Sequence, residues 1–417
     1  MTGSPMTGPR PDALASRSRL GPVVIATIMG PKGSTGVQTH FREVGDYLSS
    51  GGERPALVTP FSWGGPLSIP VFGTRRLIDP LSGAASVAWY RYWHYAFLKK
   101  ALERQLQRAP TGPATVYAQC ALSARAALVA RRDTSQKVVI AIHSDGSQAD
   151  EWVDKKMLKV GSRQYRAIKD LEHRVLPNVD GIVYVSEAAK RAMLREVPEL
   201  RNVCSVVIPN FVTLPQNAAY QGGTRDLITV GGLEIAKNHD YLFEVLVEAK
   251  RMGRTYSLDV VGDGVQRPHL ERLSRSLGLS DQVRFLGFRS DVRTLLPQYR
   301  AYVHASVRES LCLAIIEAMG SGLPVISGKV GGIPELFDPG REGLFWPLDD
   351  PEEAARTLVS LMEDPQARAN LGEAARRRFE RCFDSAKKAP ELEDFLASVS
   401  TGVASTKDKD QRAARLA

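Results

Sequence analysis

Glu309 and Glu317 carry the most distinctive chemistry of this sequence: seven residues separate them, and the apolar pattern of residues 311–319 predicts a helix. Ser310 occupies the position expected of the helix cap. Glu309 would lie near the positive end of the helix, and Glu317, two turns along at ~3.6 residues per turn, could reach hydroxyls of a bound ligand. Carboxylates accept hydrogen bonds from hydroxyls, and free N–H groups at residues 311–313 suit a diphosphate. The pattern predicts a nucleotide-sugar site; a capped amphipathic helix with incidental acids is the alternative.

The flanking residues place this helix in a parallel α/β sheet. Residues 301–306 and 324–327 read as short buried strands before and after the helix, which ends at Gly320. Gly331 and Gly332 then allow a turn that side chains would obstruct. In such a crossover unit, ligands bind at the carboxyl ends of the strands and beside helix N-termini.

The whole run from residue 304 to 334, with Gly-Leu-Pro-Val after the helix and Gly-Gly-Ile-Pro-Glu after the next strand, resembles the donor-site signature of the retaining glycosyltransferases of family 4. The resemblance implies an α/β chain of the GT-B fold, with two Rossmann-like parallel-sheet domains facing across a cleft. Glu317 would hold the ribose, and Glu309 with the backbone of residues 310–313 would hold the donor sugar. The implied donor-binding residues are Gly36, Gly231, Lys237, Gly287, Glu309, Ser310, Leu311, Cys312, Leu313 and Glu317.

Residues 227–239 predict a strand, a glycine turn and a helix, with Lys237 placed where a diphosphate would lie. Family members usually carry an arginine directly after the first glycine, here Gly231, and a lysine five residues further on. Lys237 matches the lysine, but Gly232 stands in the arginine position. This departure would weaken donor binding, transfer the charge requirement to Arg308 or Lys329, or mark loss of activity.

A glycine-rich turn opens the first half, because residues 22–29 predict a strand and residues 37–48 a helix. Residues 35–40 resemble the family loop that faces the donor phosphate and the acceptor. Thr35 replaces its first glycine, so close backbone approach is secured only at Gly36. Thr35, Gln38 and His40 are therefore expected on the acceptor side, with a plain tight turn as the alternative.

His143 follows a predicted strand at residues 137–142 and so lies where strand ends line a binding site. In the resembling enzymes, a histidine here hydrogen-bonds the donor sugar near the reacting carbon. We therefore expect His143 and Glu309 to be the catalytic residues and assign no covalent nucleophile. A histidine that only ties down a loop is the alternative.

Length and charge set broad bounds. The 417 residues suit two domains, and the formal net charge of +9 indicates an anionic partner. No nucleic-acid-binding module is recognisable. The four cysteines form no metal-binding pattern, which predicts reduced thiols in a cytosolic protein, no metal and no other cofactor. No stretch approaches the ~20 apolar residues of a membrane span.

The resemblance and composition together predict the domain organisation. We expect a disordered extension at 1–20, an N-terminal Rossmann-like acceptor domain at 21–213 and a C-terminal Rossmann-like donor domain at 214–385. A helix at 386–399 would pack back on the first domain, and a disordered tail would follow at 400–417. A long helix at 85–109 combines aromatic and basic residues, which suits either an anionic membrane surface or a core helix with a solvated face.

The predicted reaction is sugar transfer with retention from a UDP- or GDP-sugar to an acceptor hydroxyl. By family habit the acceptor would be a glycan or lipid-linked glycan of polysaccharide or cell-envelope synthesis, in the cytoplasm at the inner face of the membrane. A non-catalytic GT-B subunit that binds a sugar nucleotide or a partner is the competing hypothesis, favoured by Gly232. A nucleotide-sugar 2-epimerase of the same architecture is a further alternative.

Overall fold

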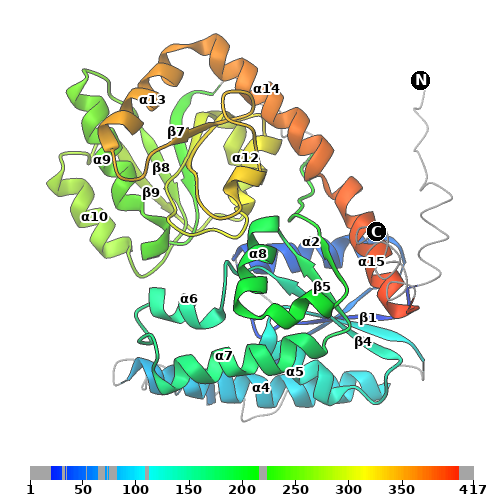
Figure 1. Cartoon of the computed structure of the whole chain (residues 1–417). Helices are drawn as coiled ribbons and strands as arrows, with labels where there is room; N and C mark the ends of the chain where they lie inside the picture. The colour runs from blue at the N-terminus through cyan, green and yellow to red at the C-terminus, as the bar shows by residue number, and fades with distance from the viewer. Residues whose placement is uncertain are drawn as a thin grey trace, which may run out of the picture.

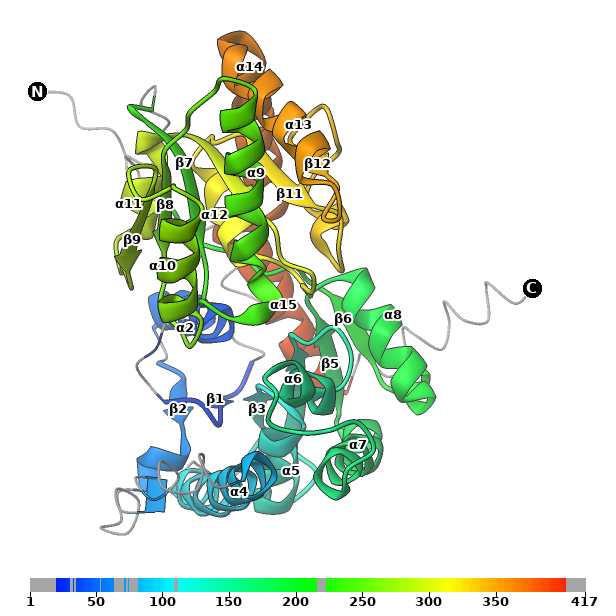
Figure 2. The same ribbon diagram turned by 90° about the vertical axis from the view of Figure 1, so that its left-hand side faces the viewer.

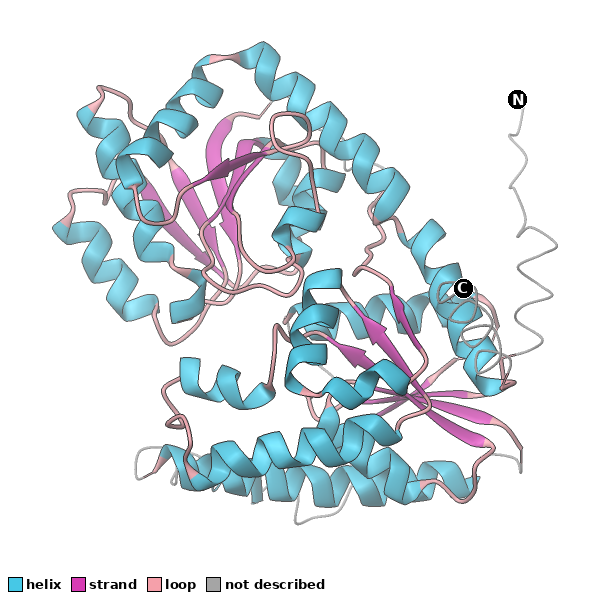
Figure 3. Ribbon diagram, in the orientation of Figure 1, coloured by secondary structure: helices cyan, strands magenta, loops and turns pink. Residues whose placement is uncertain are grey.

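The computed structural model describes residues 20–30, 33, 35–52, 54–63, 71–72, 74, 82–108, 112–215 and 223–402. The predicted extension at 1–20 and tail at 400–417 fall outside these residues, apart from residue 20 and residues 400–402. The described chain forms two α/β halves, each with a sheet flanked by helices, as Figures 1 and 3 show. This is the α/β architecture that the sequence predicts.

Among the described residues, the first half holds a six-stranded parallel sheet in the order β2-β1-β3-β4-β5-β6. Its strands are β1 (Val23–Ala26), β2 (Ala56–Val58), β3 (Ala114–Ala118), β4 (Gln136–Ile142), β5 (Gly181–Tyr184) and β6 (Ser205–Val207). Its helices are α2 (Gly36–Ser50), η1 (Pro60–Trp63), α4 (Gly83–Arg108), α5 (Ala121–Ala130), α6 (Gln148–Asp154), α7 (Arg163–Val175), η2 (Leu176–Asn178), α8 (Glu187–Glu196) and η3 (Pro198–Asn202).

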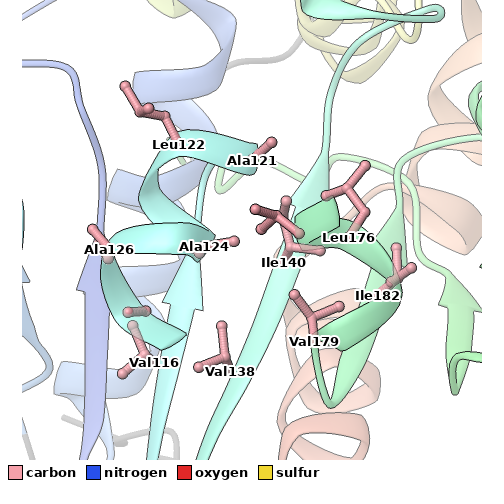
Figure 4. Packing of buried hydrophobic residues seen from close by; sticks show 14 of the residues in the cluster. Val116, Ala121, Leu122, Ala124, Ala126, Val138, Ile140, Leu176, Val179 and Ile182 are labelled. Carbon is pink, nitrogen blue, oxygen red and sulfur yellow. The ribbon is translucent and has the colours of Figure 1, made fainter. Parts of the chain in front are cut away.

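One buried cluster of this half lies between the sheet and the helices α4 and α5. Val116 and Val138 of neighbouring strands pack beside Ala124 of α5, and Figure 4 shows the cluster. Helix α4 buries Leu98 and Leu102 completely, whereas Tyr92 on the same helix is 64% exposed. The basic aromatic helix therefore contributes to the core along one face and leaves an aromatic ring in solvent.

The second half holds another six-stranded parallel sheet among the described residues, in the order β12-β11-β10-β7-β8-β9. Its strands are β7 (Arg225–Val230), β8 (Leu258–Val261), β9 (Val283–Gly287), β10 (Tyr299–His304), β11 (Val325–Gly328) and β12 (Leu344–Trp346). Its helices are η4 (Ile235–Lys237), α9 (His239–Arg251), α10 (Arg267–Ser276), α11 (Val292–Leu295), η5 (Leu296–Gln298), α12 (Leu313–Gly320), η6 (Ile333–Glu335), α13 (Pro351–Glu363) and α14 (Pro365–Cys382).

Two chain crossings connect the halves and lie side by side. The N–H of Val212 donates to the carbonyl of Phe383 (3.1 Å), and the N–H of Ser385 donates to the carbonyl of Val212 (3.2 Å). After the second crossing, α15 (Ser385–Ser400) contacts α2, β3 and β4, as Figures 1 and 2 show. Leu392 and Leu396 of α15 are buried in a cluster of the first half, so the chain returns to that half after the second crossing. We call the paired crossings at residues 212–213 and 383–385 the hinge.

None of the described helices has the length and apolar character needed to span a bilayer.

Candidate functional site

The predicted site residues come together where the carboxyl ends of the two sheets face each other. Strand β4 ends just before His143, and β10 ends at His304, five residues before Glu309. The hydroxyl of Ser310 donates to the carbonyl of His143, and the hydroxyl of Ser186 donates to the carbonyl of Ser310 (2.8 Å). Hydrogen bonds thus join the two halves directly at the candidate site.

Ser310 is not the helix cap that the sequence predicted. Helix α12 begins at Leu313, and Cys312, in an extended conformation, is its N-cap residue. The prediction was wrong because the Ser310 hydroxyl has a partner in the other half, the carbonyl of His143. Residues 310–312 therefore lie before the helix, with a bend at Ser310 and an extended Cys312.

The predicted double-glycine turn holds the loop that carries Glu309. Gly331 has a φ of +52°, and a Cβ there would lie 1.6 Å from the carbonyl oxygen of Glu309. The N–H of Gly332 donates to that same carbonyl (3.0 Å). Only glycine permits this backbone approach, so the turn after β11 fixes the position of Glu309.

Glu309 is the centre of a buried charged cluster. Its Oε1 contacts the ammonium of Lys237, the Nε2 of His304 (3.2 Å) and the hydroxyl of Ser306 (3.1 Å). The Glu309 side chain is 10% exposed and that of Lys237 is 27% exposed. Among the described residues no donor contacts Oε2, so this oxygen can accept a hydrogen bond from a hydroxyl of a ligand.

Opposite charges set the protonation of this cluster. Burial alone would raise the pKa of Glu309, but Lys237 and His304 outweigh it and hold the pKa at about 2. Burial alone would lower the pKa of His304, but Cys312 and Glu309 raise it to about 9. Near neutral pH, Glu309 is therefore a carboxylate beside two cations.

The same cluster has donor types that could hold a metal ion. Ligand atoms of His304, Glu309 and Cys312 all lie within 4.8 Å of one another, and imidazole, carboxylate and thiolate suit a thiophilic divalent ion. The Lys237 ammonium, however, already contacts the Glu309 carboxylate. A metal would have to displace that cation, so the present arrangement fits an anionic ligand better.

Glu317 lies within α12, as predicted, and has a partner that sequence reasoning missed. The Nε of Arg293, from α11, donates to Oε1 of Glu317 (2.9 Å). The same guanidinium contacts Oε1 of Glu43 in α2 of the first half (2.7 Å). Burial raises the pKa of Glu317, and Arg293 opposes this rise.

Gly232 stands where the family usually has an arginine, and neither Arg308 nor Lys329 supplies the missing positive charge. A Cβ at Gly232 would meet only ordinary contacts, 3.8 Å from Cγ of Glu234 and 4.0 Å from the carbonyl of Asp263. Arg308 forms an ion pair with Asp154 of α6 across the halves. The ammonium of Lys329 lies over the ring of Phe345, 6.0 Å from its centroid. Neither of these two side chains takes the place of the usual arginine beside Lys237.

Gly231 directly follows β7 and Gly287 ends β9, the two strands on either side of β8 in the second sheet. The N–H of Gly231 donates to the carbonyl of Val261 (3.0 Å), and a Cβ at Gly231 would lie 3.8 Å from Cε of Lys237. Gly287 has a φ of +66°, and its carbonyl accepts from the N–H of Gly262 (2.9 Å). Gly231 thus lies beside Lys237, whereas a Cβ at Gly287 would lie 3.4 Å from Nη1 of Arg267.

The glycine-rich turn of the first half reaches the second half at Gly36. A Cβ at Gly36 would lie 3.5 Å from Cδ1 of Leu313, the first residue of α12. Thr35 caps α2 by accepting from the N–H of Gln38 (3.3 Å), and the Gln38 amide donates to the carbonyl of Gly30 (2.9 Å). Thr35 and Gln38 therefore hold the turn together.

His143 and His40 form a pair of neutral rings in the first half. Their ring centroids lie 4.6 Å apart, and Nε2 of His40 is 3.1 Å from the hydroxyl of Tyr117. Burial lowers the pKa of His143 to about 4, and burial together with His143 lowers the pKa of His40 well below its ordinary value. The buried Nε2 of His143 has no hydrogen-bond partner among the described residues, so it can bind a ligand hydroxyl.

Glu335, from the Gly-Gly-Ile-Pro-Glu motif, forms another contact between the halves that sequence reasoning missed. Its carboxylate accepts from the N–H groups of Glu187 (2.8 Å) and Ala188 (2.7 Å) at the start of α8. A carboxylate at a helix N-terminus accepts hydrogen bonds from the free N–H groups and interacts favourably with the positive end of the helix dipole. The motif marked the residue, but only the fold shows that its partners lie 148 and 147 positions away in the chain.

Comparisons with known proteins bear on the family and the fold. A model described as "Glycosyltransferase Family 4" matches residues 34–215, and one described as "Glycosyl transferases group 1" matches residues 213–378. An uncharacterized glycosyltransferase of Haemophilus influenzae is 27% identical over 217 residues, 52% of this chain and 60% of that protein. A component of the phosphatidylinositol N-acetylglucosaminyltransferase of Arabidopsis thaliana is 30% identical over 239 residues, 56% of this chain and 50% of that protein.

The chain thus spans 60% and 50% of the lengths of these two relatives. Among solved structures, Anabaena Alr3699/HepE in complex with UDP and glucose superimposes with a TM-score of 0.64 at 17% identity. That match covers 91% of this chain and 100% of the other. At this identity the likeness shows a shared fold.

Proposed function

We propose that this chain, which belongs to the GT-B glycosyltransferases, transfers a sugar from a nucleoside diphosphate sugar to an acceptor hydroxyl. The family membership follows because a family 4 domain and a group 1 domain together match residues 34 to 378. The observation that carries this proposal is the Lys237–Glu309–His304 cluster beside the start of α12. It combines a cation and helix N–H groups, which suit a diphosphate, with a carboxylate that suits sugar hydroxyls.

The leaving diphosphate gains negative charge as the bond to the sugar breaks. Lys237 and the free N–H groups at the start of α12 would stabilise that charge, because both are fixed in place before the reaction. Two cations, Lys237 and His304, contact the single negative charge of Glu309. Glu309 can therefore orient Lys237 while the cluster keeps a net positive charge for the diphosphate. In this proposal, the second half binds the charged part of the donor.

The donor sugar would lie between Glu309 and His143. The free Oε2 of Glu309 would accept from a sugar hydroxyl, and the unpartnered Nε2 of His143 would bond the sugar from the other half. The neutral state of His143 suits a hydroxyl partner better than a phosphate. We propose retention at the anomeric carbon, with the leaving phosphate assisting attack on the same face.

We propose a lipid-linked or glycan acceptor. Support comes from the similarity to an enzyme component named for phosphatidylinositol, and from α4, which presents Tyr92 and basic residues at the surface. An aromatic and basic helix suits the headgroup layer of an anionic membrane. Sedimentation with vesicles of phosphatidylglycerol and phosphatidylcholine tests this setting, and equal recovery with neutral vesicles would contradict it.

The reaction is tested by incubating the protein with UDP-glucose, UDP-N-acetylglucosamine or GDP-mannose and a panel of glycan and lipid-linked acceptors. Release of UDP or GDP that depends on an acceptor, with an α-anomeric product by proton NMR, is the expected result. Inversion of the anomeric carbon would overturn the retaining mechanism.

A non-catalytic subunit that binds a sugar nucleotide is the second candidate, favoured by Gly232 in the usual arginine position and by the engagement of Arg308 with Asp154. Binding of a nucleotide without turnover in any acceptor pair would support it.

A further inference from the structure

We propose that Arg293 is a positioning residue for the donor nucleotide: it fixes the Glu317 carboxylate for the ribose hydroxyls and anchors that carboxylate to the hinge between the two halves. The inference rests on the proposed function, because it concerns the same donor site. It assigns a role to a side chain that contacts neither the diphosphate cluster nor His143.

The three guanidinium nitrogens of Arg293 each contact a different segment of the chain. Nε donates to Oε1 of Glu317 in α12 (2.9 Å), and Nη1 donates to the carbonyl of Thr213 in the first chain crossing (2.7 Å). Nη2 contacts Oε1 of Glu43 in α2 of the first half (2.7 Å). A planar fork with several donors can satisfy these partners together, whereas a lysine ammonium lacks this fixed geometry.

The three side chains form a largely buried triad. Arg293 is 24% exposed, Glu317 is 12% exposed and Glu43 is 8% exposed. Two carboxylates this close would repel each other and favour protonation without a cation between them. Burial raises the pKa of Glu317 and Glu43 adds to the rise, whereas Arg293 opposes it and so favours the charged form that accepts hydrogen bonds from hydroxyls.

Arg293 leaves half of the Glu317 carboxylate available. Its bond uses Oε1, and within the described part of the chain no donor contacts Oε2. Fixing one oxygen restricts rotation of the carboxyl plane, so the other oxygen is presented in one orientation. Such preorganisation reduces the entropy lost when a ribose binds.

The triad also lies at the hinge. Oε2 of Glu43 accepts from the N–H of Thr213 (2.9 Å), and the Thr213 hydroxyl is 2.8 Å from the hydroxyl of Ser385. Thr213 and Ser385 belong to the two neighbouring chain crossings, and Val212 pairs with Asp384 between them. Through these bonds, the orientation of Glu317 depends on the relative position of the two halves.

The test compares nucleotides with and without the ribose hydroxyls. Isothermal titration calorimetry measures binding of UDP and GDP, and of their 2′,3′-dideoxy forms, to the full chain. The variants are Arg293→Met, which removes the charge, and Arg293→Lys, which keeps it without the fork. Arg356→Met is the matched control, because Arg356 pairs with Glu352 and Glu353 on the surface of α13.

For the better-bound base, wild type should prefer the ribose form at least about tenfold, as expected for hydroxyl bonds to a charged acceptor. In Arg293→Met this preference should fall below about threefold, chiefly through weaker binding of the ribose form, and Arg293→Lys should lie between. Arg356→Met should keep the wild-type preference.

A merely structural role would weaken both nucleotide forms equally and leave the preference unchanged in both variants, which overturns the proposal. If Arg293→Met does not fold, judged by thermal unfolding, the preference in Arg293→Lys decides. If wild type binds neither UDP nor GDP, the proposed function itself fails, and that outcome is distinct from a loss of preference in the variants.

Discussion

The two halves of the molecule contribute buried side chains in different charge states to one site: charged in the second half and neutral in the first. In the second half, buried Glu309 and His304 are held in their charged forms, with pKa values of about 2 and about 9. In the first half, buried His40 and His143 are neutral, because burial lowers their pKa values and no carboxylate opposes it. Burial alone therefore does not decide protonation: an opposite charge within contact distance does. In the proposed function, the charged cluster of the second half would bind the diphosphate, and neutral His143 of the first half would bond a sugar hydroxyl.

Lys237→Met should break the charged half and have the largest effect. The substitution removes the cation from Glu309 and from the leaving diphosphate. Turnover should fall about 100- to 1,000-fold, the usual loss on removing one preorganised group that stabilises developing charge. Initial rates of nucleotide release measure the effect.

Lys250→Met is the matched control for this prediction, since Lys250 contacts the carbonyl of Gly278 at the surface of the same half. It should leave the rate within about twofold of wild type. A similar rate in Lys237→Met would mean that the charged cluster does not bind the diphosphate.

His143→Ala tests the neutral half. It should reduce turnover about tenfold, because losing one hydrogen bond to the sugar costs ~1.4 kcal/mol. The wild-type rate should show no titration of His143 between pH 6 and pH 8, because its pKa is about 4. A pH–rate profile with and without the substitution measures both effects. A rate step near pH 6.5 that disappears in His143→Ala would show that this histidine is charged in the site, contrary to the comparison.

The two halves should respond oppositely to pH in stability. The folded pKa of His143 is below the unfolded value, so its contribution is lost as pH falls from about 6.5 towards 4, and the loss by pH 5 is about 1 to 2 kcal/mol. The folded pKa of His304 is above the unfolded value, so its contribution is complete below about pH 6.5 and is lost as pH rises through about 9.

Urea unfolding at pH 5, 6.5 and 9 measures this contrast. His143→Gln should reduce the loss of unfolding free energy at pH 5, and His304→Gln should reduce the loss at pH 9. Glu309, with a folded pKa of about 2, should contribute no loss between pH 6.5 and pH 5. If both histidine variants lose stability on the same side, the assignment of one charged and one neutral half is wrong.

Glu335→Gln should have the smallest effect, because it weakens only the cap that joins the halves at α8. The cost should be about 1 kcal/mol or less, since the amide oxygen still accepts one of the two hydrogen bonds. Thermal unfolding measures it, with Glu373→Gln as the control, because Glu373 is an exposed residue of α14 that pairs with Arg377. A cost of several kcal/mol would show that the capping contact, rather than the hinge, holds the halves together.

The sequence predicted the fold class because the strands are short buried runs separated by helical patterns, and this architecture is confirmed. It also placed Glu317 in a helix and Glu309 before it. It could not reveal Arg293, whose partners Glu43 and Glu317 lie in distant segments that only the tertiary fold brings together. The cap prediction at Ser310 failed for the same reason, since its partner is the carbonyl of His143. The functional roles of the site residues stay predictions.

The most direct test is thermal unfolding with UDP, GDP and their sugars, on wild type, Lys237→Met and Glu317→Gln. A nucleotide at one hundred times its dissociation constant should stabilise the folded chain by about 2.7 kcal/mol. We expect one base to stabilise wild type, and each substitution to reduce the shift strongly. A shift that persists in both variants would place nucleotide binding elsewhere, and no shift with any nucleotide would contradict a donor site at the charged cluster.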